Sequence, residues 1–284
     1  MSIVVTGATG KLGRHVVGQL LEKVPAEQIT AVVRDEARAA GLAARGARLA
    51  VADYNAPETF DGLLSAGDKV LLISGNEFDK GRPAQHKVVI DAAGAAGVAL
   101  LAYTSAPGGL TAALADDHRA TEEILLASGV PHTLLRNGWY FENYTENLAP
   151  VLAHDAVVQA AGAGRVSAAS RADYAAAAVA VLTGEGHENQ TYELGGDTSF
   201  GFAEYAAELS RQTGREIVYN AVSVAEYTAI LTGAGLPEPL AAVFAGVDVS
   251  IEKGELEITT GDLSRLTGRP TTPLAEAVAA ALAG

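Results

Sequence analysis

The sequence predicts an α/β fold, a Rossmann-like doubly wound parallel sheet with a smaller, mostly helical C-terminal substrate region. Short aliphatic runs alternate with longer Ala- and Leu-rich stretches through the first half of the chain, as in a parallel sheet with crossover helices. These runs are continuously apolar, which is expected of strands covered by helices on both faces. A glycine-rich turn directly follows the first run, where this fold binds nucleotides.

The first half contains six expected strands, separated by segments long enough for helices. The strands are expected at Ile3–Val5, Ile29–Val33, Arg48–Ala52, Lys69–Ile73, Leu100–Thr104 and Thr133–Leu135. The helices between them are expected at Lys11–Lys23, Glu36–Ala44, Pro57–Leu64, Pro83–Ala96 and Asp116–Ala127.

Beyond about Asn137 the pieces become shorter and the regular alternation stops. We therefore predict a nucleotide-binding domain over 1–136 and a region over 137–284 that completes the fold and the substrate cleft without being an independent domain. Helices are expected here at Tyr174–Leu182, Phe202–Gln212, Val224–Leu231, Leu240–Ala245 and Leu274–Leu282, and strands at Thr191–Leu194 and Glu216–Tyr219.

Charge and composition exclude several classes of function. The 284 residues carry 20 Lys and Arg against 34 Asp and Glu, a net charge of −14, which disfavours nucleic acid and anionic membranes as partners. The absence of cysteine excludes disulfides, thiolate metal sites and cysteine nucleophiles, and we predict no metal site. The opening residues do not resemble a signal peptide, and Pro107 interrupts the uncharged stretch 92–115, so a cytoplasmic protein is expected.

The strongest motif is the glycine-rich turn after the first strand. Its first glycine permits a tight turn, the second lets the backbone approach a diphosphate, and the third lets helix and strand pack closely. The diphosphate would lie on unpaired N–H groups at the positive end of the helix dipole. The predicted cofactor-binding residues of the turn are Gly7, Ala8, Thr9, Gly10, Lys11, Leu12 and Gly13.

Arg34, the first residue after the second strand, favours NADPH as the cofactor. An acidic residue there would accept a hydrogen bond from the ribose 2′-OH, whereas a guanidinium suits a 2′-phosphate. The alternative is a surface arginine that pairs with Asp35 or Glu36.

Further candidate residues follow the third, fourth and fifth strands. Asp53 could accept the adenine amino group or cap a turn, and the sequence leaves both open. Ile73, Ser74 and Gly75 end the fourth strand at the edge where open sheets bind ligands. Tyr103 is similarly placed on the fifth strand.

No tyrosine is followed by a lysine four residues later, the pair by which short-chain dehydrogenases transfer a proton to and from alcohols. Where that pair would fall, His118 and Glu122 lie one helical turn apart. His118 could orient a cofactor ribose, or form a structural pair with Glu122.

An aromatic stretch after the sixth strand is the candidate substrate pocket. Its aromatic side chains either join the two halves of the molecule by packing between them or form a flat apolar pocket over the nicotinamide. The position of the stretch favours the pocket. The predicted pocket residues are Trp139, Tyr140, Phe141 and Asn143, together with Tyr103; Arg171 is expected to face the same cleft.

These motifs together resemble the NmrA-like branch of the atypical short-chain dehydrogenases, and within it the bacterial NADPH-dependent quinone oxidoreductases of the second type. The resemblance is carried by segments 5–13, 32–34, 52–54, 71–74, 102–105, 133–144, 171–178 and 268–272. Segments 75–81 and 106–114 depart from the family pattern, which puts the identity of the substrate in doubt.

The resemblance implies an enzyme that passes hydride from NADPH to a quinone without flavin. It adds Asn137, Gly138, Trp139, Tyr140, Phe141 and Glu142 to the expected cofactor site. The alternatives are another flat acceptor, such as a triphenylmethane dye, or a non-enzymatic NmrA-like redox sensor that regulates a partner protein. A homodimer is compatible with the sequence.

Overall fold

The computed structural model describes residues 2–76, 81–146 and 148–283. Its contacts divide the chain into two compact units. The first unit contains residues 1–106, 117–137 and 171–192, and the second contains residues 107–116, 138–170 and 193–284.

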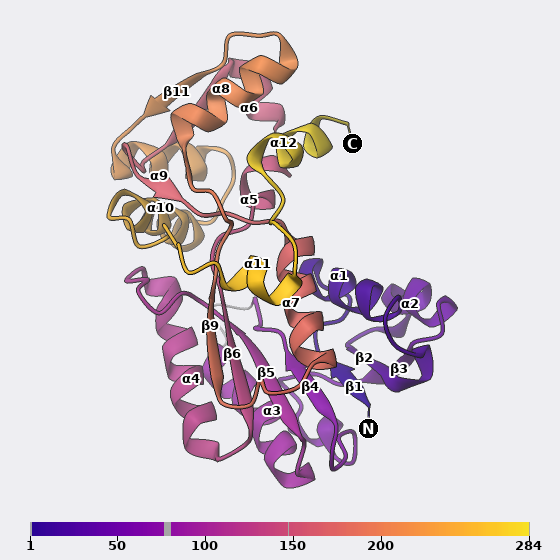
Figure 1. Cartoon of the computed structure of the whole chain (residues 1–284). Coiled ribbons are helices and arrows are strands. Elements are labelled where there is room, and N and C mark those ends of the chain that lie inside the picture. Colours follow the sequence, from indigo (N-terminus) through magenta and orange to yellow (C-terminus); the bar gives the residue numbers. More distant parts are fainter. Residues whose placement is uncertain (1, 77–80, 147, 284) are drawn as a thin grey trace. The chain divides into compact units, whose positions relative to one another are not determined.

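A seven-stranded sheet forms the centre of the first unit, with the strand order β3-β2-β1-β4-β5-β6-β9 (Figure 1). Strands β1 to β6 pair in parallel, and Ile3 of β1 lies opposite both Ile29 and Lys69. Chain order reverses between β1 and β4, and ligands bind at such a switch point in open sheets. The strands are β1 (Ile3–Val5), β2 (Ile29–Val33), β3 (Arg48–Val51), β4 (Lys69–Leu72), β5 (Leu100–Ser105), β6 (His132–Asn137) and β9 (Gln190–Leu194).

Helices cover both faces of this sheet. On one face α1 (Lys11–Leu20) packs beside α7 (Arg171–Thr183), while α3 (Arg82–Ala96) and α4 (Asp116–Ser128) cover the other (Figure 1). Alternate strand residues supply the apolar side chains under α3 and α4. Exposed polar residues occur on the edge strands, at Arg48 of β3 and Gln190 of β9. That core includes Val4, Val32, Val70, Leu72, Leu101, Tyr103 and Leu134.

The predicted fold class and strands of the first half are confirmed, but three predicted helices are shorter. The helix predicted at Lys11–Lys23 ends at Leu20. Segment 36–44 begins as a 3-10 helix, η2 (Glu36–Ala39), and only then becomes α2 (Ala40–Ala44). Segment 57–64 forms one 3-10 turn, η3 (Pro57–Phe60), and Gly62 soon follows with φ +69°, a value that an α-helix does not accept. Two further 3-10 turns are η1 (Ala26–Gln28) and η4 (Ala113–Ala115).

The chain returns to the large sheet after residue 170, and the sequence boundary at 136 does not anticipate this return. Helix α7 packs on α1, where Gln19 Nε2 donates to the Ala172 carbonyl at 2.9 Å, and β9 adds the edge strand. The division into 1–136 and 137–284 stays a prediction about folding units.

The second unit combines short helices with two small sheets. Strand β7 (Ala156–Gln159) pairs in parallel with β11 (Val218–Ala221), and β8 (Arg165–Val166) pairs antiparallel with β10 (Phe200–Gly201). Its helices are α5 (Glu142–Thr145), α6 (Ala149–His154), α8 (Phe202–Thr213), α9 (Val224–Gly233), α10 (Glu238–Glu252), α11 (Asp262–Thr267) and α12 (Leu274–Ala283).

Two predictions in this unit are inaccurate. The helix expected at 240–245 runs over 15 residues as α10, and the strand expected at 216–219 lies at Val218–Ala221. The flanks of α10 did carry signals, because Pro239 lies in its first turn and Gly254, with φ +79°, follows its end. Within the described residues no helix is long and apolar enough to cross a membrane.

Candidate cofactor and acceptor site

The glycine turn between β1 and α1 has the geometry that the motif predicts. Gly7 adopts φ +61°, and the Gly10 N–H donates to the Gly7 carbonyl at 2.9 Å. A Cβ on Gly13 would lie 2.3 Å from the Gly7 oxygen and 2.8 Å from Ala8 Cα, both backbone atoms. Only glycine therefore fits at residue 13, and the helix starts directly against the turn.

The N-terminus of α1 suits an anion. Gly10 precedes the helix without a side-chain cap, and the first turn contains no acidic residue. Buried Leu12 and Val16 anchor the helix to the core, so its N-terminal N–H groups stay fixed in direction. A diphosphate fits this arrangement, because the helix dipole and unpaired backbone donors both favour negative charge.

Arg34 lies exposed immediately after β2, as the NADPH prediction requires. The Asp35 side chain caps η2 by accepting the Ala37 N–H at 2.9 Å. The alternative, in which Arg34 pairs with Asp35 or Glu36, stays open.

Asp53 forms a local turn after β3. Its Oδ1 accepts the Asn55 backbone N–H at 2.9 Å and the Asn55 side-chain amide at 3.1 Å. This geometry supports the turn-capping interpretation, and the adenine contact stays a prediction.

The loop Ile73–Gly75 after β4 has every backbone donor bound to a protein side chain. Ile73 N donates to Thr6 Oγ1 at 3.1 Å, Ser74 N to Thr104 Oγ1 at 2.9 Å, and Gly75 N to His86 Nε2 at 2.9 Å. A ligand can therefore meet this loop through carbonyl oxygens or side chains, but not through these N–H groups.

The same loop lies against the glycine turn. A Cβ on Gly7 would lie 3.5 Å from Ile73 Cβ, an ordinary van der Waals distance. Tyr54 strengthens the junction, because its hydroxyl lies 2.9 Å from the Ile73 carbonyl and 2.5 Å from Thr6 Oγ1. The predicted cofactor loops thus share one edge of the sheet at its switch point.

Tyr103 does not lie where the pocket prediction places it. Its ring has no exposed surface, because odd-numbered positions of β5 point into the core under α3 and α4. Its hydroxyl lies 2.9 Å from His118 Nδ1, and His118 Nε2 lies 3.0 Å from Arg82 Nη2. Burial, and secondarily the Arg82 charge, lowers the pKa of His118 well below its ordinary value.

The expected pairing of His118 with Glu122 is also wrong. Glu122 accepts the Ser105 hydroxyl at 2.6 Å and binds Arg136 Nη2 at 2.6 Å and Nε at 3.0 Å. The guanidinium on the neighbouring strand offers two donors to the carboxylate, which outcompetes the weaker pairing along the helix.

The aromatic segment after β6 runs beside residue 169 in the second unit. The Ala169 N–H donates to the Trp139 carbonyl and the Phe141 N–H to the Ala169 carbonyl, both at 3.0 Å. Trp139 and Tyr140 are half-buried and Asn143 is exposed. Their roles toward an acceptor stay predictions, as do those of Gly138 and Glu142.

Phe141 differs from its neighbours because its ring is buried among other aromatic side chains. It stacks on Phe200 with a centroid distance of 5.7 Å and an interplanar angle of 15°. Phe200 also contacts the rings of Tyr144, Phe202 and Tyr205. This cluster is an apolar core for the second unit, so Phe141 anchors the segment that carries Trp139 and Tyr140.

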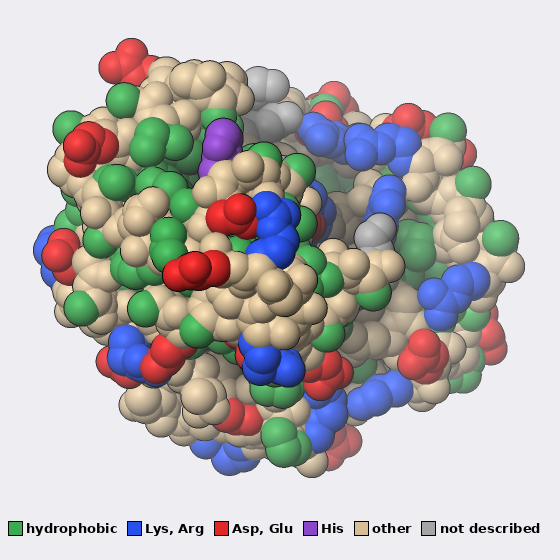
Figure 2. Space-filling model, turned by 90° about the horizontal axis from the view of Figure 1, so that it is seen from above, with side chains coloured by type: hydrophobic (Ala, Val, Ile, Leu, Met, Phe, Trp, Pro, Cys, Tyr) green, Lys and Arg blue, Asp and Glu red, His purple; other side chains and the backbone are tan. Residues whose placement is uncertain are grey.

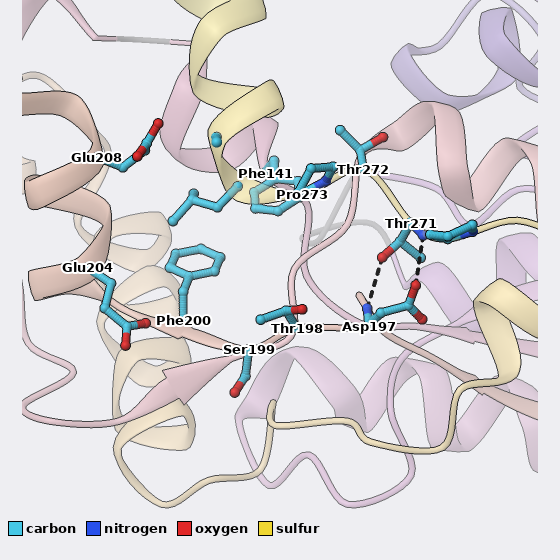
Figure 3. A pocket seen from close by; sticks show the side chains of 13 residues that line it. Phe141, Asp197, Thr198, Ser199, Phe200, Glu204, Glu208, Thr271, Thr272 and Pro273 are labelled. Carbon is cyan, nitrogen blue, oxygen red and sulfur yellow. Dashed lines mark hydrogen bonds between the residues drawn. The ribbon is translucent and has the colours of Figure 1, made fainter. Parts of the chain in front are cut away.

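A cavity of about 580 Å³ opens beside this aromatic stack, between α8 and the segment 270–275 (Figure 3). Its polar lining is acidic, but each carboxylate already has partners. Glu204 pairs with Arg165, and Asp197 exchanges hydrogen bonds with Thr271. Hydrogen bonds from Arg211 and Gln212 lower the pKa of Glu208 to about 2. The cavity would repel anions.

Asn137 and Arg171 are both buried in the first unit. Asn137 ends β6, and Arg171 is the first residue of α7. Their contacts to a cofactor stay predictions. Residues 77–80, part of the departing segment 75–81, lie outside the described residues.

Sequence reasoning missed the side chains that support loop 73–75. Thr6, Thr104 and His86 lie 11 to 67 residues from the groups they bind. Thr6 and Thr104 had a signal, because they lie in segments 5–13 and 102–105 that carry the family resemblance, whereas His86 lies in none of these segments.

The expectation that nucleic acid is not a partner stays a prediction from charge. On the face drawn in Figure 2, basic side chains lie in small groups with acidic side chains near them. Net charge is −14 overall.

Comparison with known proteins finds relatives over the whole chain. A family model described as NAD(P)H-binding matches residues 7–185. Quinone oxidoreductase 2 of Escherichia coli is 46% identical over 97% of each chain. The crystal structure of the NADPH-dependent quinone oxidoreductase QOR2 from E. coli complexed with NADPH superposes with a TM-score of 0.95, at 45% identity and 99% coverage of both chains. The triphenylmethane reductase of Citrobacter sp. complexed with NADP(H) gives a TM-score of 0.94 at 41% identity, covering 99% of this chain and 100% of that one.

Proposed function

Because the chain belongs to the NAD(P)H-binding family, we propose that it is an NADPH:quinone oxidoreductase that transfers hydride directly to the quinone without flavin. The observation that carries the cofactor half of this proposal is the turn in which Gly13 has no room for a Cβ. The quinone half is supported by a full-length relative, 46% identical, that is a quinone oxidoreductase.

Three features of the first unit would hold NADPH. The N-terminus of α1 would bind the diphosphate, Arg34 the 2′-phosphate, and loop 73–75 would form a fixed wall beside the glycine turn. NADPH supplies the hydride in such a reaction. The protein positions the acceptor and excludes water.

The protein needs no dedicated proton donor for a quinone. A hydroquinone anion is a far weaker base than an alkoxide, so water can protonate it. This agrees with the missing tyrosine–lysine pair and with the positions of Tyr103 and His118, which are buried against each other. We therefore assign no catalytic role to Tyr103 or His118.

A flat cationic dye is the second candidate acceptor. It is supported by the triphenylmethane reductase of Citrobacter, which is 41% identical to this chain. The acidic lining of the second unit is compatible with a cation, whereas a quinone carries no charge to favour or oppose it.

Loss of absorbance at 340 nm, when quinones are added to flavin-free protein and NADPH, tests the proposal. We expect many turnovers per protein molecule with simple benzoquinones or naphthoquinones. Tight NADPH binding without turnover across quinones and dyes would favour the NmrA-like sensor instead.

Trp139→Ala tests the predicted acceptor pocket. We expect a higher KM for the quinone or a lower kcat, with NADPH affinity within a few fold, because stacking is worth roughly 0.5–1.5 kcal/mol beyond burial. Val224→Ala, an exposed change in the same unit, is the control and should alter neither quantity. An unchanged KM and kcat in Trp139→Ala would remove Trp139 from the pocket.

A cytoplasmic location and a homodimer belong to the same proposal. Light scattering of the purified protein at micromolar concentration distinguishes a dimer from a monomer.

A further inference from the structure

The geometry points to His86 as a positioning residue for the cofactor site: it fixes Gly75, and with it the loop after β4, from beneath. This inference deepens the proposed function and rests on it only for the identity of the cofactor. His86 lies on α3, has no exposed surface, and its Nε2 is 2.9 Å from the Gly75 backbone nitrogen.

The hydrogen-bond partners of His86 determine which ring nitrogen carries the proton. A backbone N–H can only donate, so His86 Nε2 accepts from Gly75 and the proton of the neutral ring lies on Nδ1. That proton is donated to Thr121 Oγ1 at 2.8 Å, and the Thr121 hydroxyl donates to the Asp117 carbonyl at 2.8 Å. The ring is therefore held at both nitrogens and cannot rotate without losing both bonds.

The surroundings keep His86 neutral, which its role as an acceptor requires. Burial, and then the nearby Arg82 guanidinium, lowers its pKa to about 3. The groups facing it are Arg82 on its own helix, Tyr54 after β3, Tyr103 on β5 and Thr121 on α4. None of these carries a negative charge that would favour the imidazolium.

Gly75 matters because it belongs to the segment after β4 whose Ile73 lies against the glycine turn. Ile73 and Ser74 are already held by Thr6 and Thr104, so the His86 bond completes a row of three fixed N–H groups. Without the hydrogen bond from Gly75 to His86, the part of loop 73–75 around Gly75 could move. We expect this to lower NADPH affinity and to leave the hydride-transfer step itself unchanged.

Two substitutions of His86 separate this role from a structural one. His86→Gln places an amide oxygen near the position of Nε2 and can still accept from Gly75. His86→Asn places its amide near Nδ1 and can bond Thr121 but not Gly75. Both variants lose one of the two hydrogen bonds and part of the ring, so their melting temperatures should fall by similar amounts.

NADPH affinity, measured by titration calorimetry, is the readout. We expect His86→Asn to weaken NADPH binding about tenfold and His86→Gln by less than about threefold, since one net hydrogen bond is worth about that much. Lys87→Ala, at an exposed neighbour on α3 that pairs with Asp91, is the control and should bind as the parent does. Equal losses in the Asn and Gln variants, or none in either, would overturn the inference.

Amide hydrogen exchange tests the same contact in the unaltered protein, so its result does not depend on whether a variant folds. The Gly75 N–H should exchange slowly without any cofactor present, because a buried side chain holds it. Fast exchange at Gly75 would contradict the inference. If the parent protein fails to bind NADPH while Gly75 stays protected, the proposed cofactor is wrong and the His86 contact stands.

Discussion

Two neighbouring loops at one edge of the sheet use their backbone donors in opposite ways. The turn after β1 leads into an uncapped helix N-terminus with no acid in its first turn. The loop after β4 has all three of its N–H groups bound to Thr6, Thr104 and His86. The first loop is therefore suited to bind an anion, whereas the second is held rigid by hydrogen bonds within the protein.

This difference teaches that a position at the ligand-binding edge of a sheet does not by itself define how a residue meets a ligand. Hydrogen bonding within the protein decides which groups remain for the cofactor. The following changes test the contrast, beginning with the largest expected effect.

Gly13→Ala should abolish the anion site. The new Cβ would approach the Gly7 oxygen to 2.3 Å, so the turn must move and NADPH affinity should fall at least about a hundredfold. Gly18→Ala on the same helix is the matched control, because its nearest neighbour is the flexible end of Arg45 at 3.5 Å. Calorimetric titration measures both. Wild-type affinity in Gly13→Ala would show that the turn does not bind the cofactor.

Arg34→Ala should separate the two nicotinamide cofactors. A charge-assisted contact to phosphate is worth roughly 1.5–3 kcal/mol, so NADPH affinity should fall about tenfold to a hundredfold while NADH affinity hardly changes. Equal losses for both cofactors would give Arg34 a structural role. The same titration with each cofactor decides.

Thr104→Val should make loop 73–75 more mobile without altering the anion site at the N-terminus of α1. The partly buried Ser74 N–H loses its acceptor, which should cost about 1 kcal/mol of stability and weaken NADPH binding about three- to tenfold. Thr213→Val, which breaks only local bonds to Leu209 and Arg215 at the end of α8, is the control and should leave NADPH affinity unchanged. A loss of stability with no change in affinity would mean that the wall does not face the cofactor.

Asp248→Asn should change stability with pH and leave NADPH binding alone. Burial raises the pKa of Asp248 from 3.8 to about 7, so the folded protein binds this proton more tightly than the unfolded chain. Unfolding free energy should therefore fall as pH rises from about 4 to 7, by on the order of 2–4 kcal/mol. The variant should lose that slope in urea titrations at several pH values. If stability depends on pH in Asp248→Asn as it does in the parent protein, a group other than Asp248 causes the dependence.

Sequence patterns predicted those parts of the site that are made by local backbone. The bounds of β1 and β2 and the turn at 7–13 follow from apolar runs and glycine spacing within a few residues. The partners of His118, Glu122 and Gly75 could not be predicted in this way. They come from other elements, and a single sequence does not show which elements pack together.

The short helix after β3 illustrates the same limit. Segment 57–64 has helical spacing, yet it forms only one 3-10 turn before Gly62 adopts a positive φ. Phe60 and Leu64 reach the core under α3 without a regular helix, because burial rather than propensity decides their positions. Tertiary packing overrides the local pattern here.

Single-turnover kinetics test direct hydride transfer most directly. The flavin-free protein is saturated with NADPH, or with NADPH carrying deuterium at the transferred position of C4, and mixed rapidly with a naphthoquinone. We expect all bound NADPH to be oxidised in one phase at 340 nm, and deuterium to slow this phase. A complex that keeps its 340 nm absorbance, or that is oxidised only after flavin is added, would contradict it.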